Sequence, residues 1–126
     1  MNKASYKLKG LPPIYCINLD DEPHRWESAE SMFKEWDIEN YTRVSAYDGR
    51  EDDLSDILKG KYPDGMSSSE VGCTTSHLKA MKMFLETDEP CALMMEDDCD
   101  ISTALHWGFT WKDFYSKFLM IMMSFN

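Results

Sequence analysis

The sequence lacks the features that define several common classes of protein. Its 4 cysteines form no CxxC pair and have no spacing typical of a zinc site, so we expect buried thiols. The first apolar run is interrupted by Pro12 and Pro13 and ends at Leu19, and no stretch is long enough to cross a bilayer. These absences argue against a signal peptide and a membrane span, and we expect a cytoplasmic protein.

Positive charge is also scarce. The chain has 13 lysine and arginine residues against 23 aspartate and glutamate residues, which makes the net charge −10. Nucleic acids and anionic membranes bind basic surfaces, so we expect neither as a partner. An anionic substrate would need a local arginine or a bound cation to offset the charge of the chain.

The rest of the composition is typical of a folded domain. Of the 126 residues, 43% are hydrophobic and 13% are aromatic, which is enough for one core. We expect a flexible lead-in at residues 1–11, a folded domain at residues 12–117 and an aberrant apolar tail at residues 118–126. The sequence leaves the oligomeric state open.

Apolar patterning predicts an α/β domain in which strands and helices alternate. Strands are expected at residues 13–19, 41–47 and 91–95, and helices at residues 23–36, 51–59 and 103–117. Asp21 is the expected cap of the first of these helices. A further helix should begin after Ser67, where Glu70 completes a capping box. Gly49 lies in the turn after the second strand, and we expect it to supply a positive φ.

The strongest functional signal is the segment at residues 91–100, with the sequence CALMMEDDCD. Ligands of open α/β sheets bind beyond the carboxyl ends of the strands, where these carboxylates would lie. Strand alternation would place Glu96 and Asp98 on one face and turn Asp97 away. Carboxylates this close repel each other, and hard oxygen ligands suit Mg²⁺ or Mn²⁺. The pattern is equally typical of an acidic, solvated loop, so both interpretations stay open.

Other candidates have a structural alternative beside the functional one. Arg25 follows the first strand and could hold a diphosphate or a carboxylate, or could pair with a neighbouring helix carboxylate. Asp48 ends the second strand and could reach a ribose hydroxyl, although no glycine-rich phosphate loop accompanies it. His77 could be a core histidine rather than a ligand or a base.

Taken in order, four blocks of the sequence resemble glycosyltransferase family 25. That family includes bacterial lipooligosaccharide galactosyltransferases and procollagen galactosyltransferases. The third block, with Glu-x-Gly-Cys-x-x-Ser-His, is the most distinctive. The blocks are residues 13–19 followed by Arg25, SAYDG at residues 45–49, SEVGCTTSHL at residues 69–78 and LMMEDD at residues 93–98.

The resemblance implies a GT-A-like fold, with a Rossmann-like, mostly parallel sheet flanked by helices. It implies transfer of a sugar, often galactose from UDP-galactose, to a hydroxyl of a glycan or protein acceptor. By position in the motifs, Glu96 and Asp98 would bind Mn²⁺ or Mg²⁺. The residues matched to the UDP-sugar donor are Arg25, Asp48, Glu70, Ser76, His77 and Asp97. No residue is matched to the catalytic base.

The sequence departs from the family after the acidic motif, where members continue into an acceptor-binding half. We therefore expect only the amino-terminal half of a family 25 enzyme, truncated at its carboxyl end. The methionine-rich residues 120–124 suggest a cause, because their codons shifted by one base encode an Asp-Tyr-Asp-Val-like segment similar to the family's next strand. A frameshift near Phe118 is the corresponding hypothesis.

Two other functions compete with glycosyl transfer. A non-catalytic remnant or regulatory module would keep the donor pocket and bind a nucleotide sugar without turnover. The segment DCDIS at residues 98–102 also matches the nucleophile loop of haloacid dehalogenase-type phosphatases, but that loop normally begins its domain. An EF-hand is not expected, because its required glycine and terminal glutamate are missing.

Overall fold

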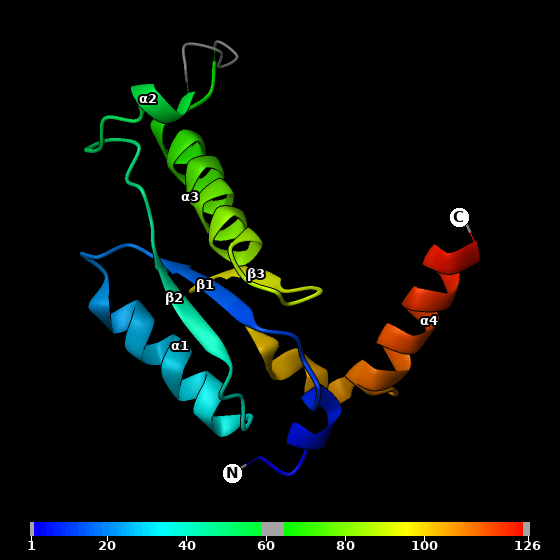
Figure 1. Cartoon of the computed structure of the whole chain (residues 1–126). Coiled ribbons are helices and arrows are strands. Elements are labelled where there is room, and N and C mark those ends of the chain that lie inside the picture. The colour runs from blue at the N-terminus through cyan, green and yellow to red at the C-terminus, as the bar shows by residue number, and fades with distance from the viewer. Residues whose placement is uncertain (1, 59–64, 125–126) are drawn as a thin grey trace.

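The computed structural model describes residues 2–58 and 65–124, with side chains as far as Ile121 (Figure 1). Most of the predicted helices and strands are present, although several bounds differ. The elements in chain order are η1 (Ser5–Leu8), β1 (Ile14–Asn18), α1 (Pro23–Glu35), β2 (Tyr41–Ser45), α2 (Ser55–Leu58), α3 (Ser68–Leu85), β3 (Leu93–Glu96), η2 (Ile101–His106) and α4 (Trp111–Ser124).

The three strands form a parallel sheet in the order β2-β1-β3, so the prediction of an α/β fold with a parallel sheet flanked by helices is confirmed. In register, Ile17 of β1 lies opposite Val44 on one side and Glu96 on the other. Every residue of β1 is buried. Such a strand is a continuous apolar run, because helices cover both faces of a parallel sheet.

The two crossover helices cover opposite faces of the sheet (Figure 1). On one face, Ile14 and Cys16 pack with Ala29 and Phe33 of α1. On the other face, the alternate residues of β1, Tyr15 and Ile17, pack in a cluster with Ala80 and Phe84 of α3. This alternation follows from the two-residue period of a strand. The chain passes from β1 to β2 on one side and then crosses to β3 on the other side of β1. The carboxyl end of β1 is therefore a topological switch point.

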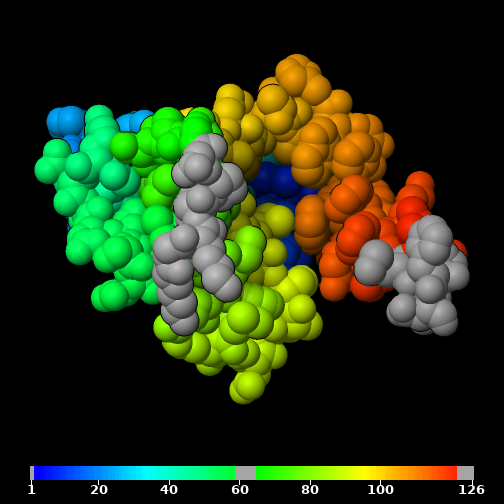
Figure 2. All heavy atoms as spheres, turned by 90° about the horizontal axis from the view of Figure 1, so that it is seen from above, coloured from blue at the N-terminus to red at the C-terminus, as the bar shows by residue number. Residues whose placement is uncertain are grey.

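The first residues, expected as a flexible lead-in, carry the 3-10 turn η1 and contribute Ala4 and Leu8 to the core. The Lys7 ammonium donates to the carbonyl oxygens of Leu105 at 2.8 Å and Trp107 at 2.7 Å. The segment therefore lies beside residues 101–115 (Figures 1 and 2). The sequence pattern missed this contact because its partners are about a hundred residues away.

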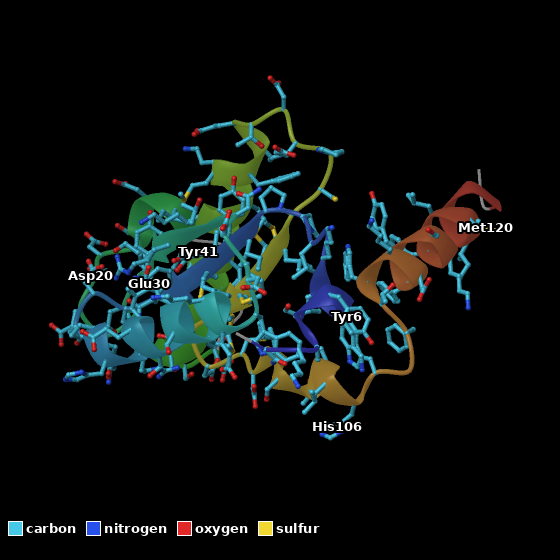
Figure 3. All side chains as sticks on the ribbon, turned by 90° about the horizontal axis from the view of Figure 1, so that it is seen from below. Tyr6, Asp20, Glu30, Tyr41, His106 and Met120 are labelled. Carbon is cyan, nitrogen blue, oxygen red and sulfur yellow. The ribbon has the colours of Figure 1, made fainter. Side chains whose placement is uncertain are left out.

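The helix predicted at residues 103–117 is wrong in its bounds. The chain forms η2, breaks around Gly108, and begins α4 at Trp111. A reciprocal cap explains the new start: Thr110 N–H donates to Asp113 Oδ2 at 3.0 Å, and Asp113 N–H donates to Thr110 Oγ1 at 3.2 Å. Helix α4 then continues into the segment predicted as a tail, and Met120 lies far from the sheet (Figure 3).

Two smaller expectations about helix starts also change. The residue that caps α1 is Glu22 rather than Asp21, and its side chain makes no capping hydrogen bond; Pro23 occupies the first turn, as predicted. The helix predicted at residues 51–59 is reduced to α2, and residue 59 lies outside the described residues. By contrast, Ser67 caps α3 as predicted, accepting a hydrogen bond from the Glu70 N–H at 3.2 Å.

Gly49 does not supply the expected positive φ, which among the described glycines belongs to Gly10 and Gly65. Glycine is needed at position 49 because the loop after β2 lies directly against the first turn of α3. A Cβ on Gly49 would lie 1.8 Å from the carbonyl oxygen of Ser68. A Cβ on Gly72 would lie 2.8 Å from the Gly49 nitrogen and 2.9 Å from the Tyr47 oxygen. Both clashes are with backbone, so neither relaxes by a side-chain rotation.

We expect Gly49→Ala and Gly72→Ala each to lower the free energy of unfolding by roughly 1–3 kcal/mol, because either methyl group forces the loop off the helix. Urea unfolding followed by circular dichroism measures the change. Gly108→Ala is the matched control, since its Cβ would meet no atom within 4 Å. Equal stability of all three variants would show that the loop does not depend on this contact.

Candidate functional site

A cleft of about 380 Å³ lies at the carboxyl ends of the three strands. It has the size of a small-molecule site and the position expected of one in an α/β sheet. The residues that line it come from the segments after all three strands and from the first turns of α3. Those with polar or charged side chains are Arg25, Tyr47, Asp48, Arg50, Ser69, Cys73, Ser76, Glu96, Asp97 and Asp98.

Arg25 and Asp97 form an ion pair on one wall of the cleft. Arg25 Nη2 lies 2.5 Å from Asp97 Oδ1 and 3.7 Å from Asp98 Oδ2. The Asp97 side chain is only 7% exposed, whereas that of Arg25 is 48% exposed. Asp97 lines the same cleft as Glu96 and Asp98, with its two oxygens directed to Arg25 and Asn18. Strand β3 ends at Glu96, so strand alternation stops before Asp97.

Glu96 and Asp98 keep oxygens that face the cleft. The Asp98 side chain is 69% exposed, and Glu96 Oε1 accepts a long contact of 3.5 Å from the Cys73 thiol. No group of three or more histidine, cysteine or acidic side chains that could hold a metal ion gathers within the described part of the chain. Two hard carboxylate ligands still suit Mg²⁺ or Mn²⁺ when substrate phosphates and waters supply the other ligands.

Asp48 and Arg50 form a second ion pair, on the wall that follows β2. Asp48 Oδ1 accepts from the Arg50 side chain at 3.1 Å and from the Arg50 N–H at 3.0 Å. These hydrogen bonds from Arg50 lower the pKa of Asp48. Arg50 was not among the residues predicted from the sequence. Its position two residues after an aspartate in a turn is the local signal that could have indicated it.

Three of the residues matched to the donor, Ser76, Glu70 and His77, belong to neither ion pair. Ser76 is buried, and its hydroxyl donates to the Gly72 oxygen at 2.6 Å and accepts from the Tyr47 N–H at 2.8 Å. It therefore fastens the loop after β2 to α3. Glu70 and His77 are not among the residues that line the cleft. The ring of His77 instead lies with Nδ1 2.9 Å from the Cys73 carbonyl oxygen.

A buried amide, missed by the sequence analysis, lies behind the acidic wall. Asn18 is 2% exposed and ends β1. Its Nδ2 donates to Asp97 Oδ2 at 2.7 Å, and its Oδ1 accepts from Arg43 Nε at 2.9 Å. Arg43 also pairs with Asp20 at 2.6 Å. The cleft is thus backed by a network of polar groups from β1, β2 and the segments after β1 and β3.

Of the thiols expected to be buried, Cys16 is buried, whereas Cys73 and Cys99 are exposed. Burial raises the pKa of Cys16 to about 12. Burial, followed by the hydrogen bond to Glu96, raises the pKa of Cys73, and burial also raises that of Cys99. A thiol reacts as its thiolate, so a raised pKa lowers its reactivity at neutral pH. The raised pKa of Cys73 therefore lowers the ionised share of this thiol at neutral pH.

A larger cleft of about 510 Å³ lies among residues 5–12 and 36–40. These residues precede β1 and β2, so this cleft lies toward the amino ends of the strands. Its walls include Tyr6, Leu8 and Trp36, and its charged residues are Lys9, Asp37 and Glu39. Ligands of α/β sheets bind at the opposite edge, and we assign the functional site there.

The fold and the cleft together define a parallel α/β protein with a charged cleft at its switch point. The family model of glycosyltransferase family 25 (LPS biosynthesis protein) matches residues 11–118. The match covers most of the 126 residues, so the chain belongs to this family, and its general chemistry is glycosyl transfer. No curated protein and no solved structure matches the chain significantly. Among the described residues, no helix has the length and apolar character needed to cross a membrane.

We expect iodoacetamide at pH 8 to modify Cys73 and Cys99 in the folded protein but to leave Cys16 unmodified. With a pKa of about 12, only about one Cys16 thiol in ten thousand is ionised at that pH. Mass spectrometry of tryptic peptides measures the modification. In urea all three should react, and all faster than when folded. Rapid labelling of Cys16 in the folded protein would contradict its burial in β1.

Proposed function

We propose that the switch-point cleft binds the diphosphate and sugar of a UDP-sugar, in a GT-A-like arrangement. The observation that carries this proposal is the convergence of two arginines and four carboxylates on one cleft in a chain of family 25. Arginines suit the phosphates of an anionic ligand, and carboxylates beside them suit a metal ion through which such a ligand binds. The alternative interpretation of the acidic run as a solvated loop does not account for Arg25 and Arg50 in the same cleft.

Each pair of charged residues has a distinct role in this proposal. Glu96 and Asp98 would hold Mn²⁺ or Mg²⁺, which supplies positive charge to the diphosphate as the leaving group departs. The exposed N–H groups of Arg25 and Arg50 would donate to phosphate oxygens. Asp48, kept ionised by Arg50, would accept from the ribose hydroxyls. Ser76 and Gly72 act indirectly, by holding the loop that carries Asp48 and Arg50.

For the reaction, we propose transfer of the sugar to a hydroxyl of a glycan or protein acceptor, with galactose from UDP-galactose as the first donor to test. The alternative is a nucleotide-sugar-binding module without turnover. One observation favours the alternative: within the described residues, the cleft contains no histidine, and its carboxylates are either paired with arginine or assigned to the metal. That leaves no group there for the role of general base.

A turnover assay separates the two functions. Incubation with UDP-galactose, Mn²⁺ and a hydroxyl acceptor, with release of UDP as the readout, should show a rate above that of buffer if the chain is a transferase. A binding module should bind UDP-galactose in calorimetry and release no UDP. Absence of both binding and release would contradict both functions.

We expect Asp98→Asn to weaken Mn²⁺-dependent binding of UDP by about 10–100-fold, because it removes one charged metal ligand. Isothermal titration calorimetry with UDP, in the presence and absence of Mn²⁺, measures the change. Glu96→Gln should behave in the same way.

Asp100→Asn is the matched control for this prediction. Asp100 belongs to the same acidic run but accepts a hydrogen bond from the Ser102 N–H at 2.9 Å, a role that asparagine can fill. Its UDP affinity should stay within about twofold of the parent protein, well below one factor of ten in Kd. Unchanged affinity in Asp98→Asn and Glu96→Gln would show that UDP binds without these carboxylates.

A further inference from the structure

Asn18 is a buried amide whose hydrogen bonds link β1 to β2 and to the segment after β3, at the edge of the cleft. Both N–H groups of its side chain are used: Nδ2 donates to Asp97 Oδ2 at 2.7 Å and to the Glu22 carbonyl oxygen at 3.1 Å. Its Oδ1 accepts from Arg43 Nε at 2.9 Å. A buried amide with its donors and acceptor paired is held in one orientation.

Arg43 decides which way the amide points. A guanidinium can only donate, so it must face the oxygen of Asn18 and leave the NH₂ group toward Asp97. Arg43 is itself held by the main-chain oxygen of Asn18 at 3.2 Å and by Asp20 at 2.6 Å, and its guanidinium lies 6.0 Å from the Trp26 ring centre. The orientation of the amide therefore follows from the neighbouring strand β2.

Asp97 is an anchor rather than a free ligand. One of its oxygens accepts from Asn18 and the other from Arg25, and its side chain is 7% exposed against 69% for Asp98. Arg25, which is half exposed, keeps further N–H groups for a ligand in the cleft. A long arginine side chain has many rotamers, so an anchor at its tip lowers the entropy lost when it binds a phosphate.

We propose that Asn18 is a positioning residue for the diphosphate: through Asp97 it holds Arg25 at the rim of the cleft. The residue must be an amide, because a carboxylate there would face Asp97 at hydrogen-bond distance and repel it. The inference deepens the proposed function of the same cleft and rests on it. Its specific content is that Asn18 affects the phosphate end of the ligand and acts only through Arg25.

The test is a double-mutant cycle of Asn18→Asp and Arg25→Ala, with UDP and uridine as ligands in calorimetry with Mn²⁺. Each single variant should weaken UDP binding by about 10-fold or more, as expected for a lost charge-assisted hydrogen bond. The double variant should be no weaker than Arg25→Ala alone, because Asn18 acts through Arg25. Uridine has no phosphate, so its binding should not change.

Other outcomes would overturn the proposal. Equal losses for UDP and uridine, or losses that add in the double variant, would mean that Asn18 supports the whole cleft rather than Arg25. If Asn18→Asp does not fold, Asn18→Ala replaces it in the same cycle, since alanine removes the hydrogen bond to Asp97 without adding charge. It should weaken UDP binding and leave uridine binding unchanged, and unchanged UDP affinity would contradict the role of the donated hydrogen bond.

Failure of the proposed function is distinguishable from failure of this inference. If the parent protein binds no UDP, the cleft is not a nucleotide-sugar site, and NMR then decides the positioning role. The Arg25 Nε–H signal, assigned by its loss in Arg25→Ala, should show a rigid side chain in the parent and a mobile one in Asn18→Asp. Equal mobility in the two proteins would overturn the inference.

Discussion

The parallel pairing of β1 with both β2 and β3 is the constraint on which the rest of the structure depends. Parallel strands end at the same edge of a sheet, so the segments after all three strands meet there. The two crossovers run over opposite faces, with α1 on one and α3 on the other (Figure 1). The cleft opens where these crossovers diverge, and its charged residues therefore come from distant parts of the sequence.

Charge at this edge is organised by three arginines in a strongly acidic chain. Arg25 pairs with Asp97, Arg50 with Asp48, and Arg43 with Asp20. Each pair offsets the repulsion that its carboxylate would otherwise feel. The negative charges of Glu96 and Asp98 are less well offset than those of the paired carboxylates. Glu96 contacts the Cys73 thiol, and Asp98 lies 3.7 Å from Arg25, which is already bound to Asp97. Negative potential is thereby concentrated at the two carboxylates that we propose as metal ligands.

Close backbone packing holds the opposite wall. Gly49 and Gly72 let the loop after β2 touch the first turns of α3, and the Ser76 hydroxyl fastens it to the Tyr47 N–H. The glycines and the serine of the two family motifs are thus explained by one contact between two segments. That contact sets the distance between the Asp48–Arg50 pair and the acidic run. Two other motif residues, Glu70 and His77, do not line the cleft.

Much of the fold and part of the site followed from the sequence alone. Strand and helix periods are local, so residues 13–19, 41–47 and 91–95 indicated the three strands, and Arg25 and the acidic run were recognised from their places after strands. Tertiary structure decided the rest. The Asn18–Asp97 hydrogen bond joins residues 79 positions apart, and no local pattern encodes it. The direction of Asp97, the burial of Leu8 and the reason for Gly49 also depend on packing between distant segments. The sequence by itself determined which residues could carry the chemistry, and only the pairing of β1 with its neighbours decided which of them face the same cleft.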